Sequence, residues 1–182
     1  LRYGENPHQE GAIYSNKYNL NIKKLNGKQL SYNNYNDIFA ALTISKSLPK
    51  NTGTVIVKHA NPSGISINKD KIKSFKLALG CDPISAFGGV ISCNFKINKM
   101  IALELNKVFF EVVIGNDIDK DAFKILKRKK NLRIINSKDI NLKNTENILS
   151  GFNSFLIQSP DTKFFSPKNF KIVSKIKPNS KT

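Results

Sequence analysis

The sequence is poor in the residues that build metal centres and disulfide frameworks. Only two of its 182 residues are cysteine and two are histidine. Cys81 and Cys93 belong to no spaced ligand motif, and the acidic residues do not cluster with His8 or His59. Such a set supplies neither a disulfide framework nor a four-ligand zinc site, and sparse cysteine is typical of a reducing compartment. We therefore expect no metal site in this chain.

Long apolar runs are also absent. The longest, such as VVI at residues 112–114, are far shorter than the ~20 residues that a membrane helix needs. The sequence does not open with a charged segment followed by an apolar one, as a secretory signal does. We expect a soluble, cytoplasmic protein that does not bind membranes.

Acidic residues are few, at 13 against 30 lysines and arginines, which gives a net charge of +17. A basic surface attracts the phosphates of nucleic acids, so a nucleic-acid-binding α/β module is one alternative. Phosphate-binding surfaces favour the planar guanidinium group, however, and this chain has only Arg2, Arg128 and Arg133. The dense basic run at 124–133 is typical of the solvated C-terminal end of a helix. We therefore expect no nucleic-acid partner.

Hydrophobic residues make up 40% of the chain, enough for a folded core. Short β-rich runs alternate with helical segments, which predicts an α/β protein with a mainly parallel sheet. We expect a hairpin turn at Asn26–Gly27, a second turn at Asn61–Pro62 and a loop or a poor helix over 136–147. Strands are expected at 54–58, 88–93, 109–115 and 132–135, with edge strands at 152–158 and 170–176. Helices are expected at 37–48 after an Asn36 cap, at 70–79 before Gly80, and at 98–107 and 119–130.

The expected strand at 54–58 ends in Lys58, and His59 follows it directly. Ligands of open α/β sheets gather at the carboxyl ends of strands, so this pair is a candidate site. The neighbouring cation disfavours a positive charge on the imidazole, which keeps the ring available as a base. The lysine can hold an anion or a developing oxyanion. The alternative is structural: Lys58 ends a strand at the surface and His59 caps the turn.

Two further segments carry residue types suited to a ligand. Residues 81–89 hold Asp82 as a turn or cap residue and end in two glycines, whose backbone amides can approach a ligand closely. Their pattern matches neither a phosphate-binding loop nor a dinucleotide fingerprint, so a tight connection into the next strand is equally consistent. In residues 1–9, Arg2, Tyr3 and His8 are suited to a phosphate and a planar base.

Taken together, these segments resemble one family closely. LRYGENPHQ, KHANPSG and DPISAFGG, in this order, with KQLSYNNYND between the first two, are similar to the AICAR transformylase domain of a bifunctional family. AICAR is aminoimidazole carboxamide ribonucleotide, and the other domain of that family is an IMP cyclohydrolase. FFEVVI and DAFKILKRKKNLRII extend the resemblance to about Arg133, and SGFNSFLIQ and FKIVSKIKP carry it to the end.

The resemblance implies a reaction and a fold. The reaction is formyl transfer from the cosubstrate 10-formyltetrahydrofolate to the amine of AICAR, in purine (IMP) biosynthesis. The fold is a three-layer one similar to cytidine deaminases, with active sites built across a homodimer. The sequence lacks the deaminase signature of His-x-Glu with Pro-Cys-x-x-Cys, so we expect no zinc.

The resemblance also implies roles for particular residues. Lys58 and His59 are expected to be the catalytic pair, and Arg2 and Tyr3 to contact the ribonucleotide. The remaining residues that the resemblance assigns to the pocket are Phe87, Gly88 and Glu111.

The resemblance covers only the first part of the transformylase domain. We expect a compact core over 30–135 and a weaker continuation over 136–182, without the family's later binding asparagine and folate contacts. The chain alone is therefore expected to be inactive, and a non-catalytic fragment is the second alternative. Two departures from the family pattern are Ser63, where cysteine is common in bacteria, and Phe152, where a second glycine is common.

Overall fold

A computed structural model describes residues 1–15, 22–140, 146–161 and 170–176. The chain divides into two compact units, Leu1–Asn141 and Leu142–Thr182. Each unit is described by itself.

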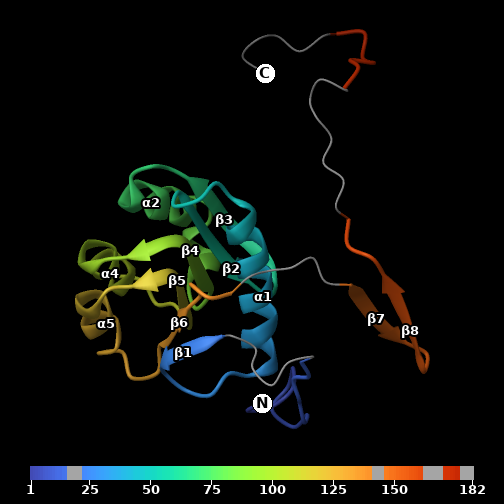
Figure 1. Cartoon of the computed structure of the whole chain (residues 1–182), viewed down its shortest axis with the longest axis horizontal. Coiled ribbons are helices and arrows are strands. Elements are labelled where there is room, and N and C mark those ends of the chain that lie inside the picture. Colours follow the sequence, from blue (N-terminus) through green and yellow to red (C-terminus); the bar gives the residue numbers. More distant parts are fainter. Residues whose placement is uncertain (16–21, 141–145, 162–169, 177–182) are drawn as a thin grey trace. The chain divides into compact units, whose positions relative to one another are not determined.

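The first unit is built on a six-stranded sheet with the order β1-β6-β5-β4-β2-β3 (Figure 1). Its strands are β1 (Lys23–Asn26), β2 (Gly53–Lys58), β3 (Asn61–Ile67), β4 (Val90–Ile97), β5 (Val112–Ile118) and β6 (Arg133–Asn136). The neighbours β4, β5 and β6 run parallel, whereas the β1–β6, β2–β4 and β2–β3 pairs are antiparallel. The predicted α/β class is therefore confirmed. The sheet is mixed: parallel pairing is limited to β4, β5 and β6, whereas the inner β2–β4 pair and both edge pairs are antiparallel.

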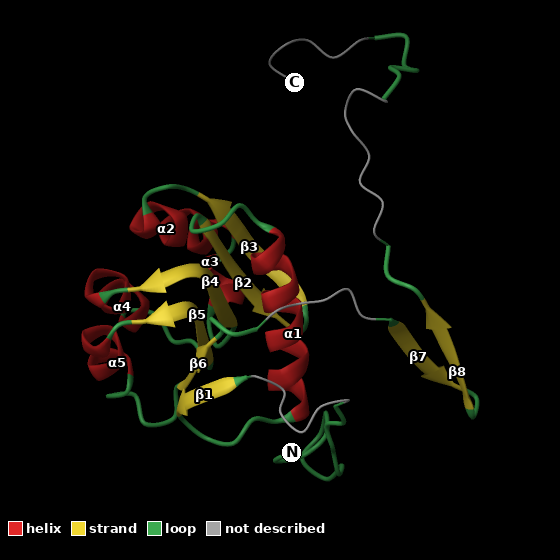
Figure 2. Ribbon diagram, in the orientation of Figure 1, coloured by secondary structure: helices red, strands yellow, loops and turns green. Residues whose placement is uncertain are grey.

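Helices cover both faces of this sheet (Figure 2). They are α1 (Tyr32–Ser47), α2 (Lys71–Cys81), the short α3 (Pro83–Ala86), α4 (Lys99–Asn106) and α5 (Lys120–Leu126). Side chains alternate along each strand, so Val55 and Val57 pack in the core under α1 while Ile56 packs with Phe75 of α2. The result is three layers with two apolar cores. Similarity to cytidine deaminases stays a prediction.

Helix α1 begins five residues earlier than the sequence pattern predicts. Ser31 caps it: its hydroxyl accepts a hydrogen bond from the Asn34 amide, and the Asn34 side chain accepts one from the Ser31 amide. A capping box usually has Glu or Gln at the third helical position, and Asn34 takes that role here. Asn36, predicted to be the cap, lies within the first turns of the helix.

Both predicted turns are wrong. Gly27, with φ of 94°, does not join two strands of a hairpin; β1 instead pairs with β6. Asn61 and Pro62 open strand β3, and the turn before it is formed by His59 and Ala60. The sequence of β3 resembles a loop because it contains Pro62 and Gly64. Proline is tolerated because β3 lies at the edge of the sheet, and a side chain at Gly64 would clash with α2, since its Cβ would meet the Ala78 carbonyl oxygen.

Several predicted boundaries also shift. Helix α2 continues through Gly80, while its N-terminal cap is Asp70. Strand β5 begins at Val112 rather than at residue 109, and α5 ends at Leu126, so the basic run from residue 127 onward follows the helix.

The second unit contains a two-stranded sheet of β7 (Asn147–Gly151) and β8 (Ser154–Gln158). Its two-residue loop is Phe152–Asn153, and both residues have positive φ, at 48° and 57°. Strand β8 lies within the run predicted at 152–158, but it pairs with β7 in a separate sheet instead of adding an edge strand to the large one. Residues 170–176 form no strand. Residues 141–145 of the predicted loop lie outside the described residues.

Among the helices that the structure describes, none is long and apolar enough to cross a membrane. In the same residues, no three histidine, cysteine, aspartate or glutamate side chains gather closely enough to hold a metal ion.

Candidate functional site

The predicted site residues lie at one end of the strands of the large sheet. Val57 of β2 pairs with Val90 of β4, Val90 with Val112 of β5, and Val112 with Arg133 of β6. Because β2 runs against β4, the C-terminal end of β2 lies beside the N-terminal ends of β4, β5 and β6. The predicted site residues thus lie at the carboxyl end of β2 but at the amino ends of β4, β5 and β6.

Lys58 and His59 occupy the end of β2 and the turn after it. His59 and Ala60 both have positive φ, at 54° and 58°, as the central residues of a type I′ hairpin turn do. The Nζ of Lys58 donates a hydrogen bond of 2.8 Å to the carbonyl oxygen of Phe87. The Asn61 side chain donates one of 2.9 Å to the carbonyl oxygen of His59.

This pair borders a cavity of about 450 Å³. Asp82 and Ser85 from the start of α3 form another part of its lining. Ser63, the departure from the family pattern, lies in the same lining, and its hydroxyl donates to the Ile56 carbonyl at 3.4 Å.

Arg2, Tyr3 and Glu111 line a second cavity, of about 500 Å³. The segment that carries Arg2 and Tyr3 is fixed beside α1, because the Arg2 amide donates to Leu30 and the Tyr32 amide donates to the Tyr3 carbonyl, each at 3.2 Å. The Arg2 guanidinium lies 5.0 Å from the centre of the Tyr3 ring. The other lining residues include three lysines, Lys28, Lys129 and Lys130.

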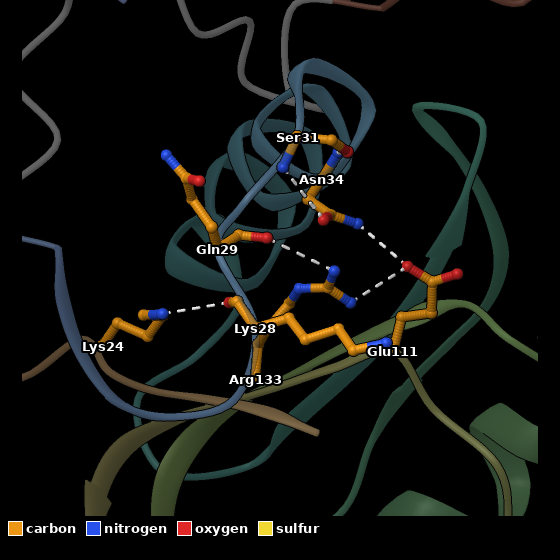
Figure 3. A network of polar contacts seen from close by, with 7 residues as sticks. All are labelled: Lys24, Lys28, Gln29, Ser31, Asn34, Glu111 and Arg133. Carbon is orange, nitrogen blue, oxygen red and sulfur yellow. Dashed lines mark hydrogen bonds and ion pairs between the residues drawn. The ribbon is translucent and has the colours of Figure 1, made fainter. Parts of the chain in front are cut away.

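Figure 3 shows how the Glu111 carboxylate is held in this second cavity. Its Oε2 accepts hydrogen bonds from the Asn34 side chain at 3.0 Å and from Arg133 at 3.3 Å, while its other oxygen points away from both donors (Figure 3). The Arg133 side chain is 8% exposed, and it also donates to the Gln29 carbonyl at 3.4 Å. Burial lowers the pKa of Arg133 and the charge of Glu111 opposes that shift.

Phe87 and Gly88, which the resemblance assigns to the pocket, are in the lining of neither of these two cavities. The Gly88 amide donates to the Phe109 carbonyl at 2.8 Å, and the rings of Phe87 and Phe109 are 5.1 Å apart. Gly88 has a φ of 72°, which glycine adopts without strain. Phe109 lines the cavity of Glu111, so this aromatic pair connects it to the segment that binds Lys58.

The structure adds functional candidates that the sequence patterns did not single out. Asn34 and Arg133 hold Glu111, and Asp37 of α1 accepts a hydrogen bond of 2.7 Å from the Ala60 amide. Burial raises the pKa of Asp37; the Ala60 hydrogen bond and the charge of His59 oppose that shift. Asn34 and Asp37 lie within the segment KQLSYNNYND, which carried part of the family resemblance but gave no sign of these contacts.

Comparison of the sequence with known proteins identifies a family. The sequence model described as AICARFT/IMPCHase bienzyme matches residues 1–182. The chain belongs to this family. Among curated AICARFT/IMPCHase relatives, the bifunctional purine biosynthesis protein PurH of Thermoanaerobacter sp. (strain X514) is 39% identical over 190 residues. That match covers 100% of this chain and 36% of the relative.

Two further members of the family give the same coverage. PurH of Aquifex aeolicus (strain VF5) is 37% identical over 184 residues, with 99% of this chain and 36% of the relative covered. PurH of Clostridium botulinum (strain Kyoto / Type A2) is 40% identical over 185 residues, with 98% and 36% covered. The chain thus spans a little more than a third of the length of these relatives.

Proposed function

We propose that this chain forms part of the AICAR site of a purine-biosynthesis enzyme that transfers a formyl group from 10-formyltetrahydrofolate to AICAR. The observation that carries the proposal is that the candidate residues lie close together. Lys58 and His59 follow β2 at the same end of the sheet at which Glu111 precedes β5. Glu111 in turn lines one cavity with Arg2 and Tyr3. Membership of the AICARFT/IMPCHase family supports it.

The cavity of Glu111 suits the ribonucleotide. Its volume of about 500 Å³ is within the usual range for small-ligand sites. Arg2 supplies a guanidinium group for the phosphate, and Tyr3 supplies a planar ring and a hydroxyl. The Glu111 oxygen that points away from Asn34 and Arg133 can accept hydrogen bonds from the ribose hydroxyls.

Lys58 and His59 supply the proton transfer and charge stabilisation that the reaction needs. The AICAR amine nitrogen attacks the formyl carbon, a carbon–nitrogen bond forms and the formyl oxygen becomes negatively charged. His59 takes a proton from the amine, and Lys58 stabilises the oxyanion or the protonation of the leaving nitrogen. Collapse breaks the bond to the folate nitrogen, which takes a proton, so that the products are the formylated ribonucleotide and tetrahydrofolate.

The rest of the proposed assembly lies beyond these residues. The folate contacts and the remaining AICAR contacts come from other parts of the natural protein, which acts as a cytoplasmic homodimer. That protein also carries the IMP cyclohydrolase activity, in keeping with the word bifunctional in the names of the relatives.

The test is a steady-state assay of the full natural protein with AICAR and 10-formyltetrahydrofolate. Lys58→Ala and His59→Ala are expected to lower kcat by a hundredfold or more, since general acid–base groups contribute about 10² to 10⁴. Arg2→Ala should instead mainly weaken AICAR binding. Lys50→Ala and Arg128→Ala, at exposed positions, are matched controls. Near-normal turnover in the His59 variant would refute the proposal.

A further inference from the structure

We propose that Asp37 is a positioning residue that anchors the turn of Lys58 and His59 and supplies a fixed negative charge to both side chains. The inference rests on the proposed formyl transfer, because it assigns a role within that same site.

The anchoring role follows from the backbone of the turn. His59 and Ala60 are consecutive residues other than glycine with φ of 54° and 58°, a conformation that costs free energy and persists only where neighbouring structure holds it. The Ala60 amide donates a 2.7 Å hydrogen bond to Oδ1 of Asp37. Asp37 belongs to α1, in a different layer from the hairpin, and the Ser31 cap fixes the start of that helix.

The electrostatic role follows from the charges around His59. The charges of Lys58 on β2 and of His59 both interact favourably with the carboxylate of Asp37 on α1. Glu111, before β5, is a second anion that acts on Asp37, and Asp82, the N-terminal cap of α3, borders the same cavity as His59. When His59 takes the proton of the amine, a positive charge develops beside Lys58. A carboxylate already in place stabilises that charge without having to reorganise.

Asp37 does not itself belong to the reacting groups. It lies in neither cavity lining among the described residues, and its Oδ1 is occupied by Ala60. Its effect therefore passes through the position and charge of Lys58 and His59.

The two roles separate in a pair of variants of the full natural protein. Asp37→Asn keeps a carbonyl oxygen for the Ala60 amide and removes the charge, whereas Asp37→Ala removes both. We expect kcat to fall about tenfold in Asp37→Asn and about a hundredfold in Asp37→Ala, with the KM for AICAR within about twofold.

Asp70→Ala is the matched control, since Asp70 also accepts backbone amides but only at the cap of α2. It should lower stability and leave kcat within twofold. Hydrogen exchange of the Ala60 amide gives a readout without activity: protection is expected to survive in Asp37→Asn and to disappear in Asp37→Ala.

The outcomes distinguish the two proposals. If the wild-type protein transfers no formyl group, the proposed function fails, and the exchange of Ala60 still decides the anchoring role. If the wild type is active and both Asp37 variants keep kcat within twofold, the role of Asp37 in the reaction is refuted. Unchanged protection of Ala60 in Asp37→Ala would refute the anchor.

Discussion

The side-chain amide of Asn34 donates a 3.0 Å hydrogen bond to Oε2 of Glu111, 77 residues further along the chain. Arg133 reaches the same oxygen from β6, so both donors hold one side of the carboxylate. The other oxygen is thereby oriented away from them (Figure 3). The Glu111 carboxylate, in the loop before β5, is thus held in one orientation by Asn34 of α1 and Arg133 of β6.

This arrangement predicts the effect of removing Arg133. Arg133→Met leaves Glu111 with one donor, and we expect the affinity for AICAR to fall about tenfold, as is typical when the partner of a binding group is lost. Titration calorimetry on the full natural protein measures the change. Arg128→Met removes an exposed arginine and is the control. An unchanged dissociation constant in Arg133→Met would show that Glu111 needs no such support.

The pKa of Asp37 predicts how its substitution changes stability with pH. Burial raises this pKa in the folded chain, so the folded state holds the proton more tightly than the unfolded state does. The ionised carboxylate therefore lowers the stability of the fold as pH rises from the ordinary carboxyl value of about 3.9. The free energy of unfolding of Asp37→Asn should therefore be higher than that of the wild type at pH 7. This difference between variant and wild type should shrink as the pH falls.

Substitution of Asp82 is expected to change stability at neutral pH in the opposite direction. Hydrogen bonds from the side chain and backbone of Ser85 lower the pKa of Asp82. Its contribution to stability is present at neutral pH and is lost as pH falls below the ordinary carboxyl value. Asp82→Asn should therefore be less stable than wild type at pH 7 and equal to it in acid, as urea unfolding at several pH values would measure. The same pH trend in both variants would contradict the assignment.

Two glycines are expected to respond oppositely to alanine. Gly27 has a φ of 94°, and a Cβ there would clash with the Leu132 carbonyl oxygen. We expect Gly27→Ala to lower the free energy of unfolding by about 2 kcal/mol. Gly80 lies within α2 with no atom within 4 Å of its Cβ position, so Gly80→Ala should raise it by up to about 1 kcal/mol. Thermal unfolding of the two variants side by side tests both signs.

The two cysteines are expected to differ in reactivity. Burial raises the pKa of the Cys93 thiol to about 12, whereas Cys81 is exposed at the end of α2. The thiolate is the reactive form, so an alkylating reagent should modify Cys81 in the folded chain and Cys93 only after unfolding. Mass spectrometry of the labelled peptides reads this directly. Equal labelling of both at neutral pH would mean that the β4 core opens readily.

The sequence patterns identified the strands and helices whose own residues carry the signal. The β-branched run of β2 and the Asp70 cap of α2 are examples, because burial and capping act locally. Strand β3 was missed since Pro62 and Gly64 are rare in strands, and only its place at the sheet edge makes them acceptable. Strand β1 has four residues without an alternating apolar pattern, so nothing in it indicated pairing with β6.

The same distinction applies to the site. The sequence could name candidates that lie in recognisable motifs: Lys58, His59, Arg2, Tyr3 and Glu111. Asp37 and Asn34 could not be named, because their roles depend on strand register and on which helix face covers the sheet edge. A hydrogen bond such as Asp37 to Ala60 is a product of tertiary packing and leaves no local pattern.

The pairing of β1 with β6 has a consequence for how the protein folds. Asn26 and Leu132, which are hydrogen-bonded across this edge, are 106 residues apart in the chain. Contacts between such distant residues close large loops and are slow to form, so we expect this edge to dock late. Arg133 lies on β6 and lines the cavity of Glu111. During synthesis, the chain can therefore complete the β2–β3 hairpin that carries Lys58 and His59 well before the cavity of Glu111 exists.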